Sequence, residues 1–467
     1  MPLRPAQRGF VRHYTYCILK AESINSFLDR RKLLCHNFLM IGKDLLKTII
    51  TDNQSRVSPR IWQRALKIPY DSGKIVTLAG VRRSGKTYHL LNIINQLKNN
   101  GVATQRILYI NFEDERLSLK SADLDLILQA YRELYPKLNL KDCYFFFDEI
   151  QEVEGWEKFI GRLYASVNTH VFITGSNVKL LSKEIATALR GRTITFEIYP
   201  LSFAEFIKIS HPNLNPYSST DKAQLVNLFE QFMRQGGFPE LVKQNDEIRE
   251  KTLQEYFNVM VLRDLIERYQ ISQGAILKYF CKRIIANSAS EFSVNKIYNE
   301  LKSQGYQIAK DTLYSYQDYV EAIYLTRFIS KYSHSVIKAE MSQKKSYVID
   351  QGLGAALDYK LSQDKGRLLE TTVALELLKQ EKQIAYYQNG AECDFVIIEK
   401  GRVVRAIQVT QDISDPSARE REIKGLVLAC RKFGLKKGTI LTFDQNEEFT
   451  VDKIKIEVIP AWQYFYD

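Results

Sequence analysis

Residues 80–87, with the sequence GVRRSGKT, satisfy the pattern GxxxxGK[ST] in full. The loop follows the apolar run Ile75–Ala79 and precedes a helical pattern that begins at Tyr88. Such a loop binds phosphate because its glycines let backbone N–H groups face the phosphate oxygens and the helix N-terminus adds partial positive charge. The motif therefore predicts a strand, a loop and a helix within a parallel α/β sheet.

The side chains of this loop have separate expected tasks. Lys86 is expected to reach the β- and γ-phosphates of ATP, and the Thr87 hydroxyl to join the Mg²⁺ shell. Arg82 and Arg83 are expected beside the nucleotide or an adjoining subunit. The other nucleotide-binding candidates are Gly80, Ser84 and Gly85.

An apolar run at 144–147 ends in the acidic pair Asp148 and Glu149. We expect Asp148 to hold Mg²⁺, mostly through water, and Glu149 to polarise the attacking water as a general base. An acidic turn after a core strand is the plainer alternative. The catalytic interpretation is favoured because the two motifs occur in the usual order, about sixty residues apart.

Polar residues near two further strands are weaker candidates. Ser176 or Asn177, after the expected strand 171–174, is suited to sense the γ-phosphate, and a capping turn is an equal alternative. Arg192 is a candidate arginine finger, acting within the chain or from a neighbouring subunit. A surface arginine beside a turn explains Arg192 equally well.

Short apolar runs alternate with helical patterns from residue 75 to about residue 198, which predicts a parallel sheet covered by helices. All five runs are nearly continuous in apolar residues, as strands buried on both faces are. The expected strands are Ile75–Ala79, 107–112, 144–147, 171–174 and 194–198.

A chain of 467 residues is too long for one ordinary core and predicts two or three domains. The pattern along the chain favours three folded units and an overall α/β class. We expect an uncertain N-terminal extension over 1–39 and a P-loop core over 40–200. A helical lid or linker over 201–275 and a winged-helix-like region over 276–335 would follow. Alternating strands and helices predict a second α/β domain over 345–467.

Composition limits the setting of the protein more than its activity. The formal net charge of +12 is spread without a dense basic tract, so it favours nucleic acid only mildly over simple solubility. The six cysteines lie far apart, which is typical of reduced thiols in a cytoplasmic protein. No apolar stretch approaches the roughly 18 residues of a membrane-spanning helix, and no membrane partner is expected.

Five segments together resemble prokaryotic AAA+-type ATPases. They are GVRRSGKT (80–87), YINFEDERL (109–117), FFFDEIQEVEGWE (145–157), FITGSN (172–177) and LRGRTITFEIYPLSFAEF (189–206). The resemblance is to the uncharacterised group in which the ATPase core precedes a helical region and a restriction-endonuclease-like domain. It implies an ASCE-type core that binds Mg²⁺-ATP, with Glu149 as the catalytic glutamate, and it implies no known substrate.

The endonuclease-like fold of this group would need an acid on a helix, an aspartate on a strand, and an acid-x-lysine on the next strand. Glu370 and Asp394 are the candidates for the first two positions. Gln408 stands where the last acid belongs and Thr410 where the lysine belongs, so a lysine such as Lys400 would have to replace it. We expect a degenerate domain without nuclease activity, kept for nucleic-acid or protein contact.

The middle region offers a candidate recognition helix for DNA. Its polar residues are Lys310, Thr312, Ser315 and Gln317, and its tyrosines at 314, 316 and 319 suit protein contact as well. The favoured function is an ATP-hydrolysing switch or motor that acts on a partner, with DNA foremost. A homo-oligomeric or protein-bound signalling or defence scaffold controlled by ATP, and an ATP-dependent nuclease, are the alternatives.

Overall fold

The computed structural model describes residues 42–56, 62, 64–176, 189, 191–211, 214–215 and 218–466. The expected extension 1–39 and Asn177 lie outside these residues. The described chain divides into two compact units. The first comprises described parts of Met1–Val57 and Ala103–Asn168, and the second those of Ser58–Val102 and Thr169–Asp467.

The expected parallel sheet is present, and its strand order is β2-β3-β4-β1-β5. Every pairing of β1 with β4 and β5, and of β2 with β3, is parallel. The strands begin and end within about one residue of the expected positions. They are β1 (Ile75–Ala79), β2 (Ile107–Asn111), β3 (Tyr144–Asp148), β4 (Val171–Gly175) and β5 (Thr193–Glu197). This confirms the predicted fold of a P-loop NTPase.

The expectation that all five strands are buried on both faces is wrong for β5. All residues of β1 and β4 are buried, whereas Ile194 of β5 is 38% exposed. The order of the sheet explains the difference, because β5 lies at an edge and, within the described part of the chain, pairs with β1 alone. An apolar run alone does not distinguish an edge strand from a central one.

Within the first unit, amphipathic helices pack on β2 and β3. Helix α2 (Lys43–Ser55) buries Leu46, Ile49 and Ile50, and Asn53 Nδ2 donates a hydrogen bond to the Tyr109 carbonyl over 3.1 Å. The remaining helices of this layer are α4 (Leu124–Leu134) and α5 (Trp156–Ser166). In the second unit, α3 (Lys86–Asn99) directly follows the phosphate loop.

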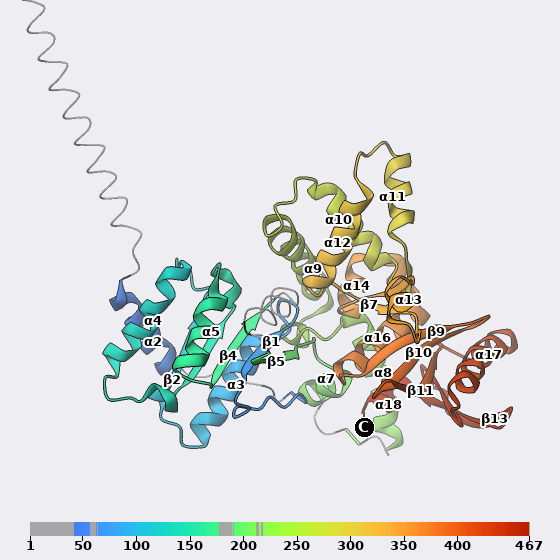
Figure 1. The fold of residues 1–467 in the computed structure, drawn as a ribbon. Helices are drawn as coiled ribbons and strands as arrows, with labels where there is room; N and C mark the ends of the chain where they lie inside the picture. The colour runs from blue at the N-terminus through green and yellow to red at the C-terminus, as the bar shows by residue number, and fades with distance from the viewer. Residues whose placement is uncertain are drawn as a thin grey trace, which may run out of the picture. The chain divides into compact units, whose positions relative to one another are not determined.

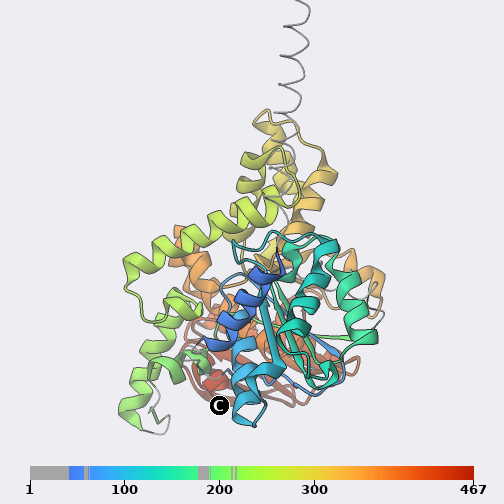
Figure 2. The same cartoon turned by 90° about the vertical axis from the view of Figure 1, so that its left-hand side faces the viewer.

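Helices follow the sheet in the second unit, as expected. They are α7 (Phe203–Ser210), α8 (Ser219–Gln235), α9 (Asp246–Val259) and the π-helix η8 (Met260–Glu267). Helix α9 and η8 form one continuous helix (Figure 2). The chain turns after α8 at Gly236, whose φ is +77° and where a Cβ would lie 2.0 Å from Asp350 Oδ1. Only glycine fits this position.

The next segment contains four helices and a three-stranded antiparallel sheet. Its elements are α10 (Gly274–Ala286), β6 (Ser290–Phe292), α11 (Val294–Ser303), α12 (Lys310–Ala322), β7 (Thr326–Ser330), α13 (Val336–Glu340) and β8 (Lys344–Val348). The sheet order is β6-β8-β7. Ser293 caps α11, because its side chain accepts a hydrogen bond from the Lys296 N–H over 3.4 Å.

The last segment is a mixed sheet of order β13-β14-β12-β11-β10-β9 with helices on both faces (Figure 1). Phe395 and Ile397 of β10 pack with α16, and Val396 between them packs with α17, because alternate residues face opposite sides. The helices are α14 (Gln351–Leu357), α15 (Tyr359–Gln363), α16 (Lys365–Lys379), α17 (Pro416–Phe433) and α18 (Ala461–Tyr466). The strands are β9 (Gln383–Gln388), β10 (Glu392–Glu399), β11 (Arg402–Val409), β12 (Lys437–Thr442), β13 (Glu447–Val451) and β14 (Ile454–Pro460).

None of the helices in the described part of the chain is long and apolar enough to span a bilayer.

Candidate nucleotide-binding site

The phosphate loop leaves the end of β1 and turns directly into α3. A Cβ at Gly80 would lie 2.1 Å from the Ile198 carbonyl oxygen, so this first position requires glycine. Gly85 has a φ of +101°, and Ser84 closes a turn by donating its N–H to the Val81 carbonyl over 3.2 Å. The backbone therefore takes the course that the glycine spacing predicts.

Lys86 places its ammonium group on the loop itself. Its Nζ donates to the carbonyl oxygens of Gly80 and Val81 over 3.2 and 3.3 Å, and the residue is 4% exposed. Thr87 is the next residue of α3 and is half-buried. The first turn of α3 carries no acidic residue, so no carboxylate there opposes an anion at the helix N-terminus.

Among the buried hydroxyls of the second unit that have no hydrogen-bond partner within the described residues, Ser84 Oγ and Ser176 Oγ follow β1 and β4. Ala79 pairs with Gly175 in the parallel register, so the loop and Ser176 leave the sheet at the same edge. A buried hydroxyl without a partner is costly, and an external acceptor such as a phosphate oxygen would satisfy it. These positions fit a bound polyphosphate.

Arg64, which the sequence analysis did not identify, supports the loop. Its Nη1 donates to the Ser84 carbonyl over 3.1 Å, and its Nε donates to Glu205 over 2.8 Å. Burial favours the neutral form of Glu205, but the Arg64 guanidinium outweighs it and lowers the pKa of this carboxyl. Burial and Arg64 lower the pKa of the nearby His89 to about 3, so His89 stays neutral.

Arg82 and Arg83 both bond to carboxylates of the helical region. Arg82 Nε lies 3.1 and 3.0 Å from the two carboxylate oxygens of Asp264. Arg83 Nη1 lies 3.2 Å from Glu240 Oε2, and its guanidinium lies 5.6 Å from the centroid of the Tyr256 ring. The sequence motif alone does not predict Asp264 and Glu240 as partners, because they lie more than 150 residues further along the chain.

In the first unit, the acidic pair lies at the end of β3 as predicted. Asp148 is fully buried, and its Oδ2 accepts a hydrogen bond from the Tyr109 hydroxyl over 2.9 Å. Burial, reinforced by Asp148, raises the pKa of Tyr109 above its ordinary range, so Tyr109 remains a donor. Glu149 adopts a left-handed backbone with a φ of +52°, and Gln151 Nε2 donates to its carboxylate over 2.6 Å. A non-glycine residue in this conformation is typical of functional sites.

The structure does not bring Arg192 to the phosphate loop within one chain. Its carbonyl accepts from the Ile75 N–H over 2.9 Å, at the start of β1, whereas the loop follows the end of β1. The intervening strand is about 16 Å long, which is beyond the reach of an arginine side chain. Asn177, the other sensor candidate, is outside the described residues.

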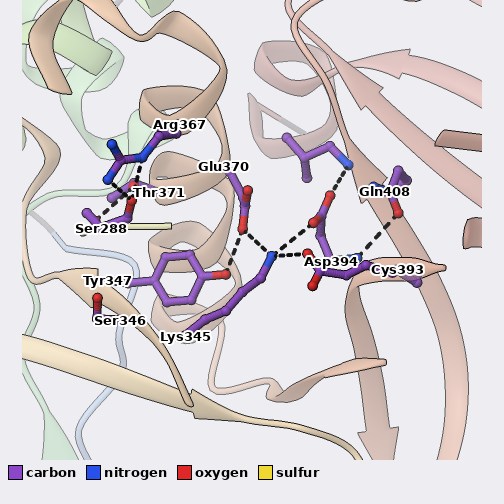
Figure 3. Close-up of polar contacts among 12 residues, drawn as sticks. Ser288, Lys345, Ser346, Tyr347, Arg367, Glu370, Thr371, Cys393, Asp394 and Gln408 are labelled. Atoms are coloured by element: carbon purple, nitrogen blue, oxygen red, sulfur yellow. Dashed lines mark hydrogen bonds and ion pairs between the residues drawn. The ribbon is translucent and has the colours of Figure 1, made fainter. Parts of the chain in front are cut away.

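Glu370 and Asp394 do meet, but around a lysine that the sequence analysis missed (Figure 3). Lys345 Nζ of β8 lies 3.0 Å from Glu370, 3.2 Å from Asp394 and 2.6 Å from Glu392. Although burial alone would lower it, Tyr347 and the three carboxylates raise the pKa of Lys345. Burial, together with Glu370, raises the pKa of Asp394 to about 8.

Gln408 and Thr410 are engaged within the C-terminal segment. Gln408 accepts from the Asp394 N–H over 3.3 Å and donates to Glu422 over 2.6 Å, and Thr410 Oγ1 donates to the Asp412 carbonyl over 3.2 Å. In the part of the chain that the structure describes, no three His, Cys, Asp or Glu side chains are arranged to hold a metal ion. Lys400, the expected replacement, lies in an exposed turn.

Family models match three successive parts of the chain. An AAA domain matches residues 72–207, and two domains of unknown function, DUF8612 and DUF4143, match 226–365 and 365–464. An uncharacterised protein, MJ1544, of Methanocaldococcus jannaschii is 35% identical over 448 residues, covering 93% of this chain and 98% of its own. The chain belongs to the family of this protein.

The family is not confined to archaea. An uncharacterised protein of Haemophilus influenzae is 31% identical, covering 84% of this chain and 94% of its own. Among solved structures, the Walker-type ATPase PABY2304 of Pyrococcus abyssi is 15% identical, covers 64% of this chain and 98% of its own, and has a TM-score of 0.40. The structure of CDC6P of Pyrobaculum aerophilum is 13% identical, covers 63% of this chain and 90% of its own, and has a TM-score of 0.25. At these TM-scores the likeness is too distant to bear on function.

The match to the AAA domain model confirms the expected AAA-type P-loop domain, and the endonuclease-like domain stays a prediction.

Proposed function

We propose that this protein binds Mg²⁺-ATP at the loop 80–87 and hydrolyses it as a switch that acts on DNA. The observation that carries the proposal is the chemistry of the loop edge. A buried ammonium, Lys86, and two buried hydroxyls without partners, Ser84 and Ser176, lie at the edge of the second unit where the helix N-terminus also lies. This combination suits a polyphosphate rather than a neutral ligand.

Hydrolysis is assigned to the acidic pair. Glu149 would take the proton of the attacking water, and its hydrogen bond from Gln151 orients the carboxylate for this task. Thr87 and Asp148 would hold Mg²⁺, which offsets the charge that develops on the phosphate oxygens. The hydrogen bond from the Tyr109 hydroxyl to Oδ2 helps to orient the Asp148 carboxylate. Arg192 is retained as an arginine finger only for a neighbouring subunit.

The DNA part of the proposal rests on the segment from α10 to β8. Its order of helix, strand, two helices and two strands, with the short α13 between the last two strands, resembles that of a winged helix, in which the third helix enters the major groove. The segment 274–348 carries eleven Lys and Arg residues against six Asp and Glu residues. Lys302, Lys310 and Tyr314 are exposed along α11 and α12, and such surfaces suit phosphates.

A protein-binding scaffold is the second candidate, because α13 displays apolar side chains between β7 and β8. Val336, Ile337 and Met341 are 77%, 75% and 84% exposed. Exposed apolar clusters often mark protein contacts.

ATP turnover measured with and without duplex DNA distinguishes the two candidates. For the DNA switch, DNA changes turnover in the parent protein, and Lys310→Ala weakens this response and the dependence of DNA binding on salt. Lys424→Ala is the matched control, since Lys424 is exposed on α17, far from α12 in sequence. An ATP turnover rate that DNA does not change, together with no DNA binding at low salt, would favour the protein-binding scaffold.

A further inference from the structure

The two arginines of the phosphate loop make contacts that the binding of phosphate does not require. Asp264, the partner of Arg82, is 2% exposed and lies in the π-helix η8. Glu240, the partner of Arg83, lies in the turn before α9, and Tyr256 lies within α9 itself. Both loop arginines therefore contact the same continuous helix or the turn before it, Arg83 at that turn and at the middle of the helix and Arg82 near its end.

The π-helix is an unusual element at this place. It spans eight residues, Met260–Glu267, whereas π-helical segments are usually single turns and occur often at functional sites. An α-helical register is the ordinary alternative for the same residues, and changing the register rotates every side chain that follows. Met260–Glu267 is thus suited to adopt two discrete arrangements, which coupling between sites requires.

The end of this helix contacts the candidate recognition helix. The Tyr269 ring stacks on Tyr319 of α12, with centroids 3.8 Å apart and planes inclined by 10°. Gln273 Nε2 donates to the Gln307 carbonyl, just before α12, over 3.2 Å. Between these contacts, Gln270 has a φ of +50°, which fixes a sharp turn. The segment 260–273 is therefore bound by the phosphate loop on one side and by α12 on the other.

We propose that the segment 260–273 transmits the nucleotide state of the loop to α12, with Asp264 as an internal anion that competes with the nucleotide phosphates for Arg82. This inference rests on the proposed function, since it requires a nucleotide at the loop. With no nucleotide, Arg82 neutralises the buried Asp264 carboxylate. A bound polyphosphate draws the guanidinium away, and Asp264 then loses the cation that stabilises its charge in the π-helix. The helix shifts its register, and the stacked pair of Tyr269 and Tyr319 carries this shift to α12.

The same competition sets the direction of the effect on affinity. A ligand shifts an equilibrium only by the difference in its affinity for the two states. Replacing the Asp264 carboxylate with an amide removes the competing charge, so Asp264→Asn should bind nucleotide more tightly than the parent. Glu240→Gln should change affinity less, because Arg83 and Glu240 are 59% and 45% exposed and solvent screens their attraction.

The test is hydrogen exchange measured by mass spectrometry on the full chain, with and without the non-hydrolysable analogue AMP-PNP and Mg²⁺. In the parent, the analogue should change exchange both in 260–267 and in α12. Asp264→Asn should bind the analogue in calorimetry but lose the response of α12. Arg83→Ala should retain the response of α12 to the analogue. Tyr319→Leu leaves the loop intact and should keep the response of 260–267 while losing that of α12, which covers the case in which Asp264→Asn does not fold.

The outcomes separate this inference from the proposed function. Absence of AMP-PNP binding to the parent in calorimetry overturns both. Binding with unchanged exchange in 260–267 overturns the coupling alone and leaves the nucleotide site standing. A response of α12 that persists in Tyr319→Leu overturns the route through the stacked tyrosines.

Discussion

Lys86 Nζ lies 3.2 Å from the carbonyl oxygen of Gly80, so the lysine folds back onto the first residue of its own loop. Lys86→Ala removes the only ammonium in the loop sequence, and we expect ATP affinity to fall by about tenfold or more, or about 1.4 kcal/mol. Lys98→Ala, in the last turn of the same helix, should bind as the parent does. Unchanged affinity of Lys86→Ala in titration calorimetry would remove the central claim.

Glu149→Gln keeps the shape of the side chain and removes its basicity. We expect turnover to fall by roughly 100-fold or more while ATP binding persists, since general bases contribute rate enhancements of this order. Glu154→Gln, five residues along and exposed, is the matched control. Should the Glu149 variant hydrolyse ATP as fast as the parent, another group is the base.

Gly80→Ala should destabilise the second unit, because the new Cβ would lie 2.1 Å from the Ile198 carbonyl oxygen. Relieving such a clash typically costs about 1–3 kcal/mol in the free energy of unfolding. Gly42→Ala meets no atom within 4 Å and should change this free energy little. Urea titration of both variants checks the difference, and equal midpoints would contradict the close approach.

The acidic cluster around Lys345 predicts a pH dependence of stability. The pKa of Asp394 is about 8 in the folded protein, against an ordinary value of 3.8, owing to burial and to Glu370, with Lys345 and Glu392 also facing it. A raised folded pKa contributes stability that is complete below about pH 4 and is lost as the pH rises through about 8. The free energy of unfolding should therefore fall less steeply with pH in Asp394→Asn than in the parent. For one proton this fall is at most about 1.4 kcal/mol per pH unit.

Urea titrations between pH 5 and 9 measure this slope. Asp71→Asn, at an exposed site, should retain the slope of the parent. A parent and an Asp394 variant with equal slopes would show that Asp394 ionises normally in the fold.

The C-terminal domain should not cut DNA. A nuclease of the expected kind needs a lysine beside the attacking water and a metal between carboxylates. Lys345 instead bonds to those carboxylates, and Gln408 bonds to Glu422 and to the backbone of Asp394. Linear and supercoiled DNA incubated with the protein, ATP and Mg²⁺ or Mn²⁺ should stay intact. Cleavage by the parent that disappears in Asp394→Ala would contradict this prediction and make an ATP-dependent nuclease the favoured function.

The sequence by itself determined the phosphate loop and the strands around it, because these depend on local spacing. Residues 80–87 must turn between a strand and a helix, and Gly80 and Gly85 occupy the positions where a Cβ or an ordinary φ would not fit. Strands such as β1 were also predictable, since a strand buried on both faces is a continuous apolar run.

Only the tertiary structure decided which strands lie side by side and which charged residues form pairs. The edge position of β5 depends on the strand order, and the separation of Arg192 from the loop depends on which end of β1 it meets. Asp264 lies 182 residues from Arg82, and Asp394 lies 49 residues from Lys345. No periodicity links residues so far apart. Their charges meet because a buried charge is costly without a partner, and the packing of whole helices and sheets decides which partners lie within reach.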